Sequence, residues 1–297
     1  MGRIDLDTVC RIGAYLHQYH SHCGKPNPLA LWENMPQENK DATTSWGEVA
    51  QWYDELVTKG EGTYQSELIL PKLRKLLALK KDEKVLDLGC GQGFFSFAMW
   101  REGALVLGAD ISKELIEIAK KRILKEVTDY SLQFKTAPAH QLPFIQNGAM
   151  DTVVCVLALQ NMRDMPGVLR ECSRVLKYGG RLCLVLSHPA FRVPKASDWG
   201  WDEKQKIEYR RVEKYMSAFT APIRMHPGQS QEVETVTFHW PLTELFDAFL
   251  KVGFLTKKLD EWTSHRRVKV GPRAKALDAA KREIPLFLYI EALKLKP

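Results

Sequence analysis

The sequence predicts an α/β protein whose main domain is a doubly wound, mostly parallel sheet. Three observations predict this fold. Residues 84–187 alternate apolar runs with helical patterns, the first apolar run ends in a glycine-rich turn, and the second ends in an aspartate. Alternation of this kind is typical of a parallel sheet that is covered by helices on both faces.

The glycine-rich turn follows the first predicted strand, at 84–89. Asp87 lies inside the apolar run, and Gly89, Gly91 and Gly93 follow at the spacing G-x-G-x-G. Glycine is needed where a backbone turns sharply and comes close to a ligand. The spacing differs from the G-x-G-x-x-G of dinucleotide binders. An acid before the turn also suits a cationic amine better than a pyrophosphate.

The second predicted strand, at 104–110, ends in Asp110. An acid about 20 residues beyond a glycine turn can accept hydrogen bonds from a ribose diol. The ends of the first two strands therefore predict a nucleoside ligand.

Residues 84–187 resemble the core of a class I S-adenosylmethionine-dependent methyltransferase, of the small-molecule kind called methyltransferase type 11. The resemblance rests on the glycine turn, on Asp87 and Asp110, and on the strands and helices that follow. It implies a Rossmann-like sheet of about seven strands, whose last strand runs antiparallel to the others. The alternative is a generic doubly wound domain with a glycine turn.

Hydrophobic periodicity predicts the other elements of the core. Helices are expected at 93–102, 113–127 and 164–176, and further strands at 132–136, 151–157 and 181–187. Tyr178-Gly179-Gly180 is expected to end the third helix. Helix 242–252 and strands near 254–260 and 286–294 are expected to complete the sheet.

We therefore expect four regions along the chain. Residues 1–45 are a helical extension that packs on the core or on a second subunit, as in a homodimer. Residues 46–187 form the S-adenosylmethionine-binding core, and 241–297 form the end of its sheet. Residues 188–240 are rich in aromatic residues and lack sustained periodicity, so they are expected to be a substrate lid inserted after the fifth strand.

The resemblance implies a set of cofactor contacts. It places Asp87 near the amine, Asp110 at the ribose hydroxyls and Ile111 on the adenine. The full set is Tyr53, Tyr64, Asp87, Gly89, Cys90, Gly91, Asp110, Ile111, Ala139, His140 and Leu157.

Two parts of this set need comment. Many relatives carry an acid where this chain has Pro138, so the backbone N–H of Ala139 or His140 would contact the adenine instead. Tyr53 and Tyr64 would close over the methionyl end, as N-terminal aromatic residues do in relatives.

The methyl acceptor is expected beyond the fourth and fifth strands. Gln160 and Asn161 could orient it, or could cap the helix that follows. Aromatic residues of the predicted lid suit a partly apolar or aromatic acceptor, or form an ordinary subdomain core. These residues are Phe191, Trp199 and Tyr215.

His188 and His239 are candidate general bases, because an imidazole can take a proton near neutral pH. His188 follows the fifth strand at the ligand end of the sheet, so it is the favoured candidate. A structural role is the alternative for either histidine, and many methyltransferases use no base.

Composition bounds the function classes. The chain has 297 residues, of which 45% are hydrophobic, so a folded core is expected. No apolar run approaches the roughly 20 residues that span a bilayer, and the first residues lack a signal-peptide core. Six scattered cysteines indicate a cytoplasmic protein. The spacing of the N-terminal cysteines and histidines fits no common zinc pattern, so no metal is expected.

The formal charge of +7 gathers partly toward the C-terminal side, where Asp260 and Glu261 interrupt the basic residues. We interpret this stretch as a solvated face rather than a nucleic-acid footprint.

The sequence thus favours a methyltransferase that acts on a small metabolite at oxygen, nitrogen or carbon. The alternatives are an RNA-modifying methyltransferase and a non-catalytic cofactor-binding protein. The sequence after the fourth strand, Leu157-Ala158-Leu159-Gln160, lacks the Asn/Asp-Pro-Pro-aromatic run of nucleic-acid enzymes.

Overall fold

A computed structural model describes residues 46–59, 62–127, 130–224, 234–268 and 270–296. Residues Thr43–Pro297 belong to one compact unit. The predicted N-terminal extension, 1–45, lies outside the described residues, and so do its cysteines and histidines.

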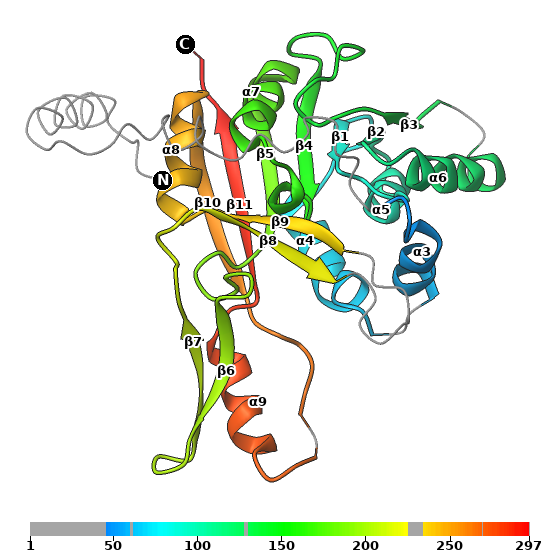
Figure 1. The fold of residues 1–297 in the computed structure, drawn as a ribbon. Coiled ribbons are helices and arrows are strands. Elements are labelled where there is room, and N and C mark those ends of the chain that lie inside the picture. Colours follow the sequence, from blue (N-terminus) through cyan, green and yellow to red (C-terminus); the bar gives the residue numbers. More distant parts are fainter. Residues whose placement is uncertain (1–45, 60–61, 128–129, 225–233, 269, 297) are drawn as a thin grey trace, which may run out of the picture. The chain divides into compact units, whose positions relative to one another are not determined.

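A seven-stranded sheet organises the unit, in the order β10-β11-β5-β4-β1-β2-β3 (Figure 1). Strands β1 to β5 pair in parallel, and β11 is antiparallel to both β5 and β10. The predicted Rossmann-like sheet and its antiparallel last strand are confirmed. The strands are β1 Lys84–Leu88, β2 Leu105–Asp110, β3 Leu132–Thr136, β4 Met150–Val156, β5 Leu176–Ser187, β10 Phe254–Trp262 and β11 Phe287–Lys294.

The strand order reverses at β1, which has β2 on one side and β4 on the other. Ligands of such sheets bind beyond the carboxyl ends of the strands at this point. β10 and β5 run in the same direction, because both are antiparallel to β11. Ser187 and Trp262 therefore lie at the same edge as the ends of β1 and β4. We call it the carboxyl edge.

The helices begin where local chemistry favours it. Ser112 and Asp164 accept hydrogen bonds from backbone N–H groups three residues later, which caps α6 and α7. Pro71 lies in the first turn of α4, where a missing N–H is tolerated. The helical elements are α3 Ala50–Lys59, the π-helix η1 Gln65–Ile69, α4 Leu70–Leu77, α5 Phe94–Arg101, α6 Lys113–Glu126, the 3-10 helix η2 Leu159–Asn161, α7 Met165–Val175, α8 Leu242–Lys251 and α9 Ala274–Glu283.

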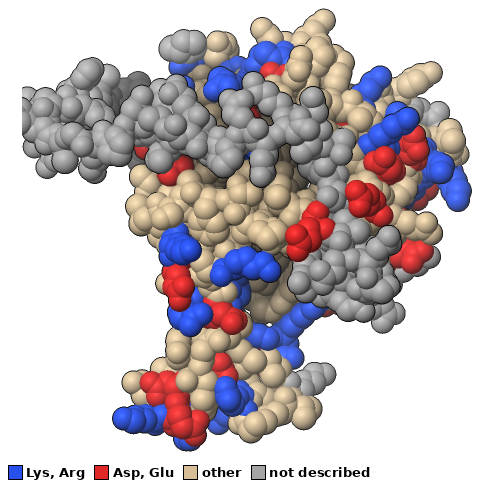
Figure 2. Space-filling model, viewed as in Figure 1, with Lys and Arg blue, Asp and Glu red and all other residues tan. Residues whose placement is uncertain are grey.

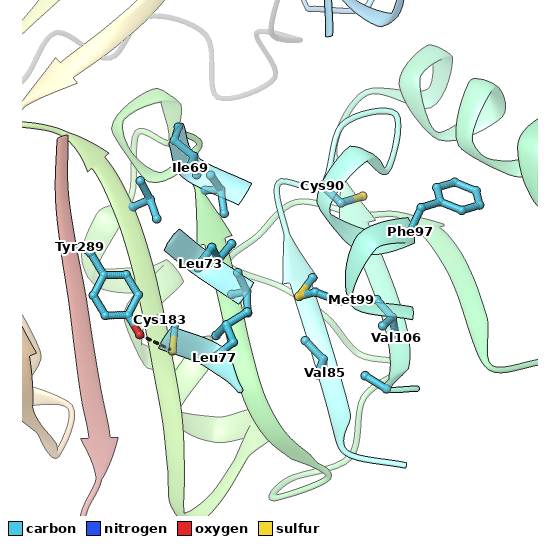
Figure 3. Packing of buried hydrophobic residues seen from close by; sticks show 14 of the residues in the cluster. Ile69, Leu73, Leu77, Val85, Cys90, Phe97, Met99, Val106, Cys183 and Tyr289 are labelled. Carbon is cyan, nitrogen blue, oxygen red and sulfur yellow. Dashed lines mark hydrogen bonds between the residues drawn. The ribbon is translucent and has the colours of Figure 1, made fainter. Parts of the chain in front are cut away.

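The core lies on both faces of the sheet. On one face, Ile69, Leu73 and Leu77 pack in a cluster that also holds Cys183 and Tyr289 (Figure 3). Helices α5 and α6 add side chains to the same cluster. Helix α7 contacts β5, helix α8 contacts β10, and the two helices contact each other. Because strand side chains alternate between faces, this arrangement fixes the register of the central strands.

The third core helix ends earlier than the sequence predicted. α7 stops at Val175, and the extended Leu176 already belongs to β5. Gly179 and Gly180 lie at the irregular start of β5, where the pairing with β4 shifts between Met150 and Thr152. These glycines therefore shape a strand and do not cap the helix.

The insertion after β5 contains two hairpins that the sequence did not predict. They are β6 Ser197–Asp202 with β7 Ile207–Val212, and β8 Phe219–Arg224 with β9 Glu234–His239. In β7, exposed residues alternate with half-buried ones and none is fully buried. Such a strand leaves no apolar alternation for a sequence reading to detect.

The C-terminal region is also more than the end of the sheet. Helix α9 lies between β10 and β11 in the chain and contacts β7 (Figure 1). It has no buried residue, so its sequence shows no strong apolar stripe. Among the described residues, no helix has the length and apolar content that a membrane span requires.

Candidate functional site

The turn after β1 is held by its own backbone. The N–H groups of Gly89 and Cys90 donate to the carbonyl of Ala109, at 2.8 and 3.2 Å, and that of Gly93 donates to Cys90 at 3.0 Å. Gly89, Gly91 and Gly93 have φ values of 70°, 55° and 86°, which favour glycine. Because these N–H groups are engaged within the protein, they do not form the ring of free donors that a pyrophosphate requires.

Gly89 is also required by packing. A Cβ atom at this position would lie 2.4 Å from Cβ of Ala158 and 3.0 Å from Cε of Met162. The loop after β4 therefore presses directly on the turn after β1. Glycine here makes room for the protein itself, and the predicted contact of Gly89 with the cofactor stays a prediction.

Asp110 lies at the end of β2 and bridges the turn to the next helix. Its Oδ2 accepts from the N–H of Gly91 at 2.9 Å, and its Oδ1 accepts from the N–H of Ser112 at 2.9 Å. Burial raises the pKa of Asp110, and these backbone hydrogen bonds act in the opposite direction. A carboxylate oxygen has two lone pairs, so each oxygen can still accept from a hydroxyl group.

Asp87, in β1, is buried more deeply than Asp110, and only 2% of its surface is exposed. Burial raises its pKa to about 7, and the negative charge of Asp110 adds to the increase. The hydroxyl of Ser96 donates to its carboxylate and opposes the shift. A cation beside this carboxylate would favour its charged form.

The sulfur of Cys90 faces the core. The side chain is buried and belongs to the same hydrophobic cluster as Phe97 and Val106 (Figure 3). Burial raises the pKa of its thiol well above the ordinary value. Cys90 therefore contributes its backbone to the turn, and its side chain contributes to packing.

The predicted adenine contacts Ala139 and His140 belong to the segment 137–144, which we call the adenine loop and which starts beside Asp110. The N–H of Ala137 donates to the backbone carbonyl of Asp110 at 2.9 Å, which places Ala139 and His140 at the carboxyl edge. His140 is exposed, and so is Ile111, the residue after Asp110, which is 46% exposed. An exposed apolar residue beside the predicted ribose contact offers a surface for an adenine ring.

The far end of this loop is fixed to α7. Glu171 accepts from the N–H of Leu142 at 2.6 Å. Arg174 donates to the carbonyls of Leu142 and Ile145 at 2.9 and 2.7 Å. Arg174 also bonds Glu171, which lowers the pKa of that carboxyl group. Both ends of the predicted adenine loop are therefore held in place.

The remaining predicted cofactor residues are placed as follows. Tyr53 lies in α3, and its side chain is outside the described residues. The hydroxyl of Tyr64 lies 2.8 Å from that of Ser264, just beyond the end of β10 at the carboxyl edge. Leu157 directly follows β4 with a φ of 54°, and its N–H donates to the carbonyl of Val185 at 2.7 Å.

A cavity of about 430 Å³ lies at the ends of β4 and β5. The β8–β9 hairpin and the segment after β5 complete its wall. The residues that line it are Leu159, Gln160, Leu186, Ser187, Pro189, Arg192, Pro194, Lys195, Pro222, Ile223, Thr237, Phe238, His239, Trp240 and Leu245.

This cavity contains only some of the predicted acceptor residues. Gln160 lines it, whereas Asn161 donates back to the carbonyl of Leu157 at 3.4 Å. Neither residue caps α7, because Asp164 does so. Gln160 is therefore the better placed of the two to contact an acceptor.

The predicted aromatic residues lie behind the cavity wall. Phe191 packs on the ring of His188, with 4.8 Å between ring centroids. Trp199 lies in β6, and Tyr215 packs beside His239 at 6.0 Å. Phe238 and Trp240, which the sequence analysis did not select, supply aromatic rings to the cavity instead.

His188 is buried, with 2% exposure, and both of its ring nitrogens are engaged. Nδ1 accepts from the N–H of Ala190 at 3.2 Å, so Nε2 is the nitrogen that donates to Glu261, at 2.7 Å. Burial lowers the pKa of His188, and Glu261 opposes the shift. His188 can therefore take a proton from a methyl acceptor only after the ring loses its contact with Ala190 or with Glu261.

His239 lines the cavity at the end of β9. Its Nε2 lies 2.8 Å from the carbonyl of Tyr215 and donates to it. Burial lowers its pKa, which favours the neutral imidazole. The sequence selected His239, but it gave no signal for Arg192 and Lys195, which are single charges in an irregular segment.

Comparisons with known proteins find methyltransferases. Residues 86–184 match the model of a family described as a methyltransferase domain. The chain is 35% identical over 101 residues to a ubiquinone biosynthesis O-methyltransferase of Xanthomonas oryzae, covering 34% of this chain and 41% of that protein. It is 34% identical over 164 residues to the 27-O-demethylrifamycin SV methyltransferase of Amycolatopsis mediterranei, covering 54% and 59%. The matched segments thus span between 41% and 59% of these relatives.

Solved structures show the same fold. An S-adenosylmethionine-dependent methyltransferase from Mesorhizobium loti superposes with a TM-score of 0.60 at 22% identity, over 78% of this chain and all of that one. The PH0226 protein of Pyrococcus horikoshii superposes at 0.54 and 21% identity, over 84% and 99%. Residues 86–184 thus match a methyltransferase domain, and they lie in a Rossmann-like sheet with an acid-flanked glycine turn. The structural neighbour from Mesorhizobium loti is described as dependent on S-adenosylmethionine.

The residues present fit this cofactor. Asp87 offers a buried carboxylate to an ammonium group, and Asp110 has lone pairs for a ribose diol. Gln92, in the turn, is 2% exposed, and its Nε2 has no acceptor among the described residues. A buried hydrogen-bond donor without an acceptor is rare. The carboxylate of the cofactor's amino-acid part would be an acceptor for Nε2 of Gln92.

Proposed function

We propose that the protein is an S-adenosyl-L-methionine-dependent methyltransferase that acts on a small, partly apolar metabolite. The observation that carries the proposal is the position of the cavity. It opens at the ends of β4 and β5, next to the turn whose two acids suit the cofactor. A cofactor and an acceptor could therefore meet at the carboxyl edge.

The protein's role would be to bind, align and exclude water. When bound, the cofactor supplies a methyl group on a sulfonium, which already carries the driving force for in-line displacement. Asp87 would hold the amine, Asp110 the ribose hydroxyls, and Ile111 with the loop at Ala139 the adenine. Gln160 would orient the acceptor, and the apolar cavity walls would exclude water.

The methylated atom is proposed to be a hydroxyl oxygen. Two of the relatives carry names that specify O-methylation. A hydroxyl group could donate a hydrogen bond to Gln160, whose Oε1 is buried without a partner among the described residues. Whether His188 or His239 then takes the proton stays a prediction.

The surface does not favour an RNA substrate. Basic residues of the C-terminal region have partners in the protein: Lys257 pairs with Glu291 at 2.8 Å, and Arg267 pairs with Asp278 at 3.0 Å. On the face shown in Figure 2, basic and acidic side chains are interspersed. A cytoplasmic location and a homodimer through residues 1–45 also stay predictions.

The test is transfer of a labelled methyl group from S-adenosyl-L-methionine. The protein is incubated with a small-molecule extract and, separately, with total RNA. We expect label in the small-molecule fraction and none in RNA, and no label with Gly91→Val. Label in RNA alone would favour the RNA enzyme, and cofactor binding without any transfer would favour a binding protein.

A further inference from the structure

Arg192 lines the acceptor cavity and has no counter-charge. Its guanidinium makes no ion pair and donates no hydrogen bond to the described residues, and its Nε is buried without an acceptor. Burial lowers its pKa to about 10, and the positive charge of Arg210 adds to the effect. Arg192 is half-buried, and a partly buried cation without an ion-pair partner is stabilised by a ligand that neutralises it.

Arg210 provides an internal comparison. Each of the two guanidinium carbons lies 5.5 Å from the ring centroid of Trp199. Arg210, however, donates to the carbonyl of Phe191 at 2.9 Å and to the hydroxyl of Ser197 at 2.8 Å. Among the described residues, Arg210 therefore has hydrogen-bond partners for its guanidinium, whereas Arg192, which lines the cavity, has none.

The backbone of Arg192 is held at the end of β5. Its backbone N–H donates to the carbonyl of His188 at 2.8 Å, and the ring of His188 is bonded to Glu261 in β10. The side chain of Arg192 therefore starts from a short, held turn and reaches the cavity from there. A planar guanidinium matches a carboxylate, which it can bind through two parallel hydrogen bonds.

The other residues of the cavity restrict what it can hold. Nine of the fifteen lining residues are apolar, none is acidic, and the second charged residue is Lys195. Gln160 also lines the cavity, and its Oε1 has no donor among the described residues. The cavity therefore combines two cationic side chains, a hydrogen-bond acceptor and apolar walls.

On the basis of the function proposed above, we propose that the methyl acceptor is an apolar organic acid. Arg192 binds its carboxylate, the apolar walls hold its body, and Gln160 accepts from its hydroxyl group. Arg192 is then a specificity-determining residue for the acceptor.

The test uses probes that differ only in charge. Benzoate, naphthalene-2-carboxylate and decanoate are each compared with the matching primary amide, by calorimetry on the full chain with S-adenosylhomocysteine present. We expect at least one carboxylate to bind about tenfold or more tightly than its amide, the range of a charged hydrogen bond. Arg192→Gln should remove this preference and leave amide binding unchanged.

Arg210→Gln is the matched control, because it removes the other guanidinium beside Trp199, and it should keep the preference. The proposal is overturned if no carboxylate is preferred by the wild-type protein, or if Arg192→Gln retains the preference. Binding of S-adenosylhomocysteine alone is measured in parallel. If the product fails to bind, the methyltransferase function fails; if it binds and no charge preference is seen, only the organic-acid proposal fails.

Discussion

The carboxylate of Asp110, at the end of β2, accepts a hydrogen bond from the N–H of Gly91 in the turn after β1, at 2.9 Å. The residue expected at the ribose therefore also fixes the turn next to Asp87, which is expected at the amine. One side chain joins the two halves of the proposed cofactor site.

Asp110→Ala should weaken binding of S-adenosylhomocysteine by about 1.5–3 kcal/mol, the range for hydrogen bonds to a charged group. Calorimetry measures the change. Asp151→Ala is the control, because Asp151 pairs with Lys177 at the start of β4, away from the carboxyl edge. An unchanged affinity in Asp110→Ala would show that this acid does not contact the cofactor.

Gly91→Val should abolish cofactor binding in a folded protein. Gly91 has a φ of 55°, and a β-branched residue there would strain the turn and place methyl groups beside the ligand. Gly179→Val is the matched control, since Gly179 has a φ of 77° and nothing within 4 Å of an added Cβ. Circular dichroism checks folding, and native affinity in Gly91→Val would contradict the proposed role of the turn.

The affinity for S-adenosylhomocysteine should rise with pH because of Asp87. Its pKa is raised from 3.8 to about 7, so the stability it contributes is present below about pH 3.8 and is lost as pH rises through about 7. A bound ammonium group stabilises the carboxylate, so affinity should increase about tenfold between about pH 6 and about pH 8. In Asp87→Asn this dependence should disappear. A wild-type affinity that does not change with pH would rule out the amine contact.

His188→Ala should lower turnover and the Arg192-dependent preference for carboxylates, and leave cofactor affinity nearly intact. The reason is that the ring of His188 accepts from the N–H of Ala190, in the turn that leads to Arg192, and donates to Glu261. Glu261→Gln separates a positioning role of His188 from proton transfer. The amide oxygen of glutamine still accepts a hydrogen bond from Nε2 of His188, but the negative charge of the carboxylate is lost. If His188 positions, the pH–rate profile stays in place in Glu261→Gln. A shift of its acid limb would identify His188 as the base.

The sequence predicted the centre of the sheet because β1, β2 and β4 are largely apolar runs. The two acids were found because they stand in or at the end of such runs, where the topology of the sheet decides what they face. The β6–β7 hairpin and α9 were missed because none of their residues is fully buried. Arg192 was missed because what distinguishes it is the lack of a partner, which only the tertiary structure reveals.

The bonds from Glu171 and Arg174 to Leu142 and Ile145 have a consequence for how the cofactor is received. They order the loop during folding, so its conformational entropy is not lost a second time when the adenine binds. The proposed adenine end of the site is therefore preorganised, so we expect that association there would not wait for a loop to close.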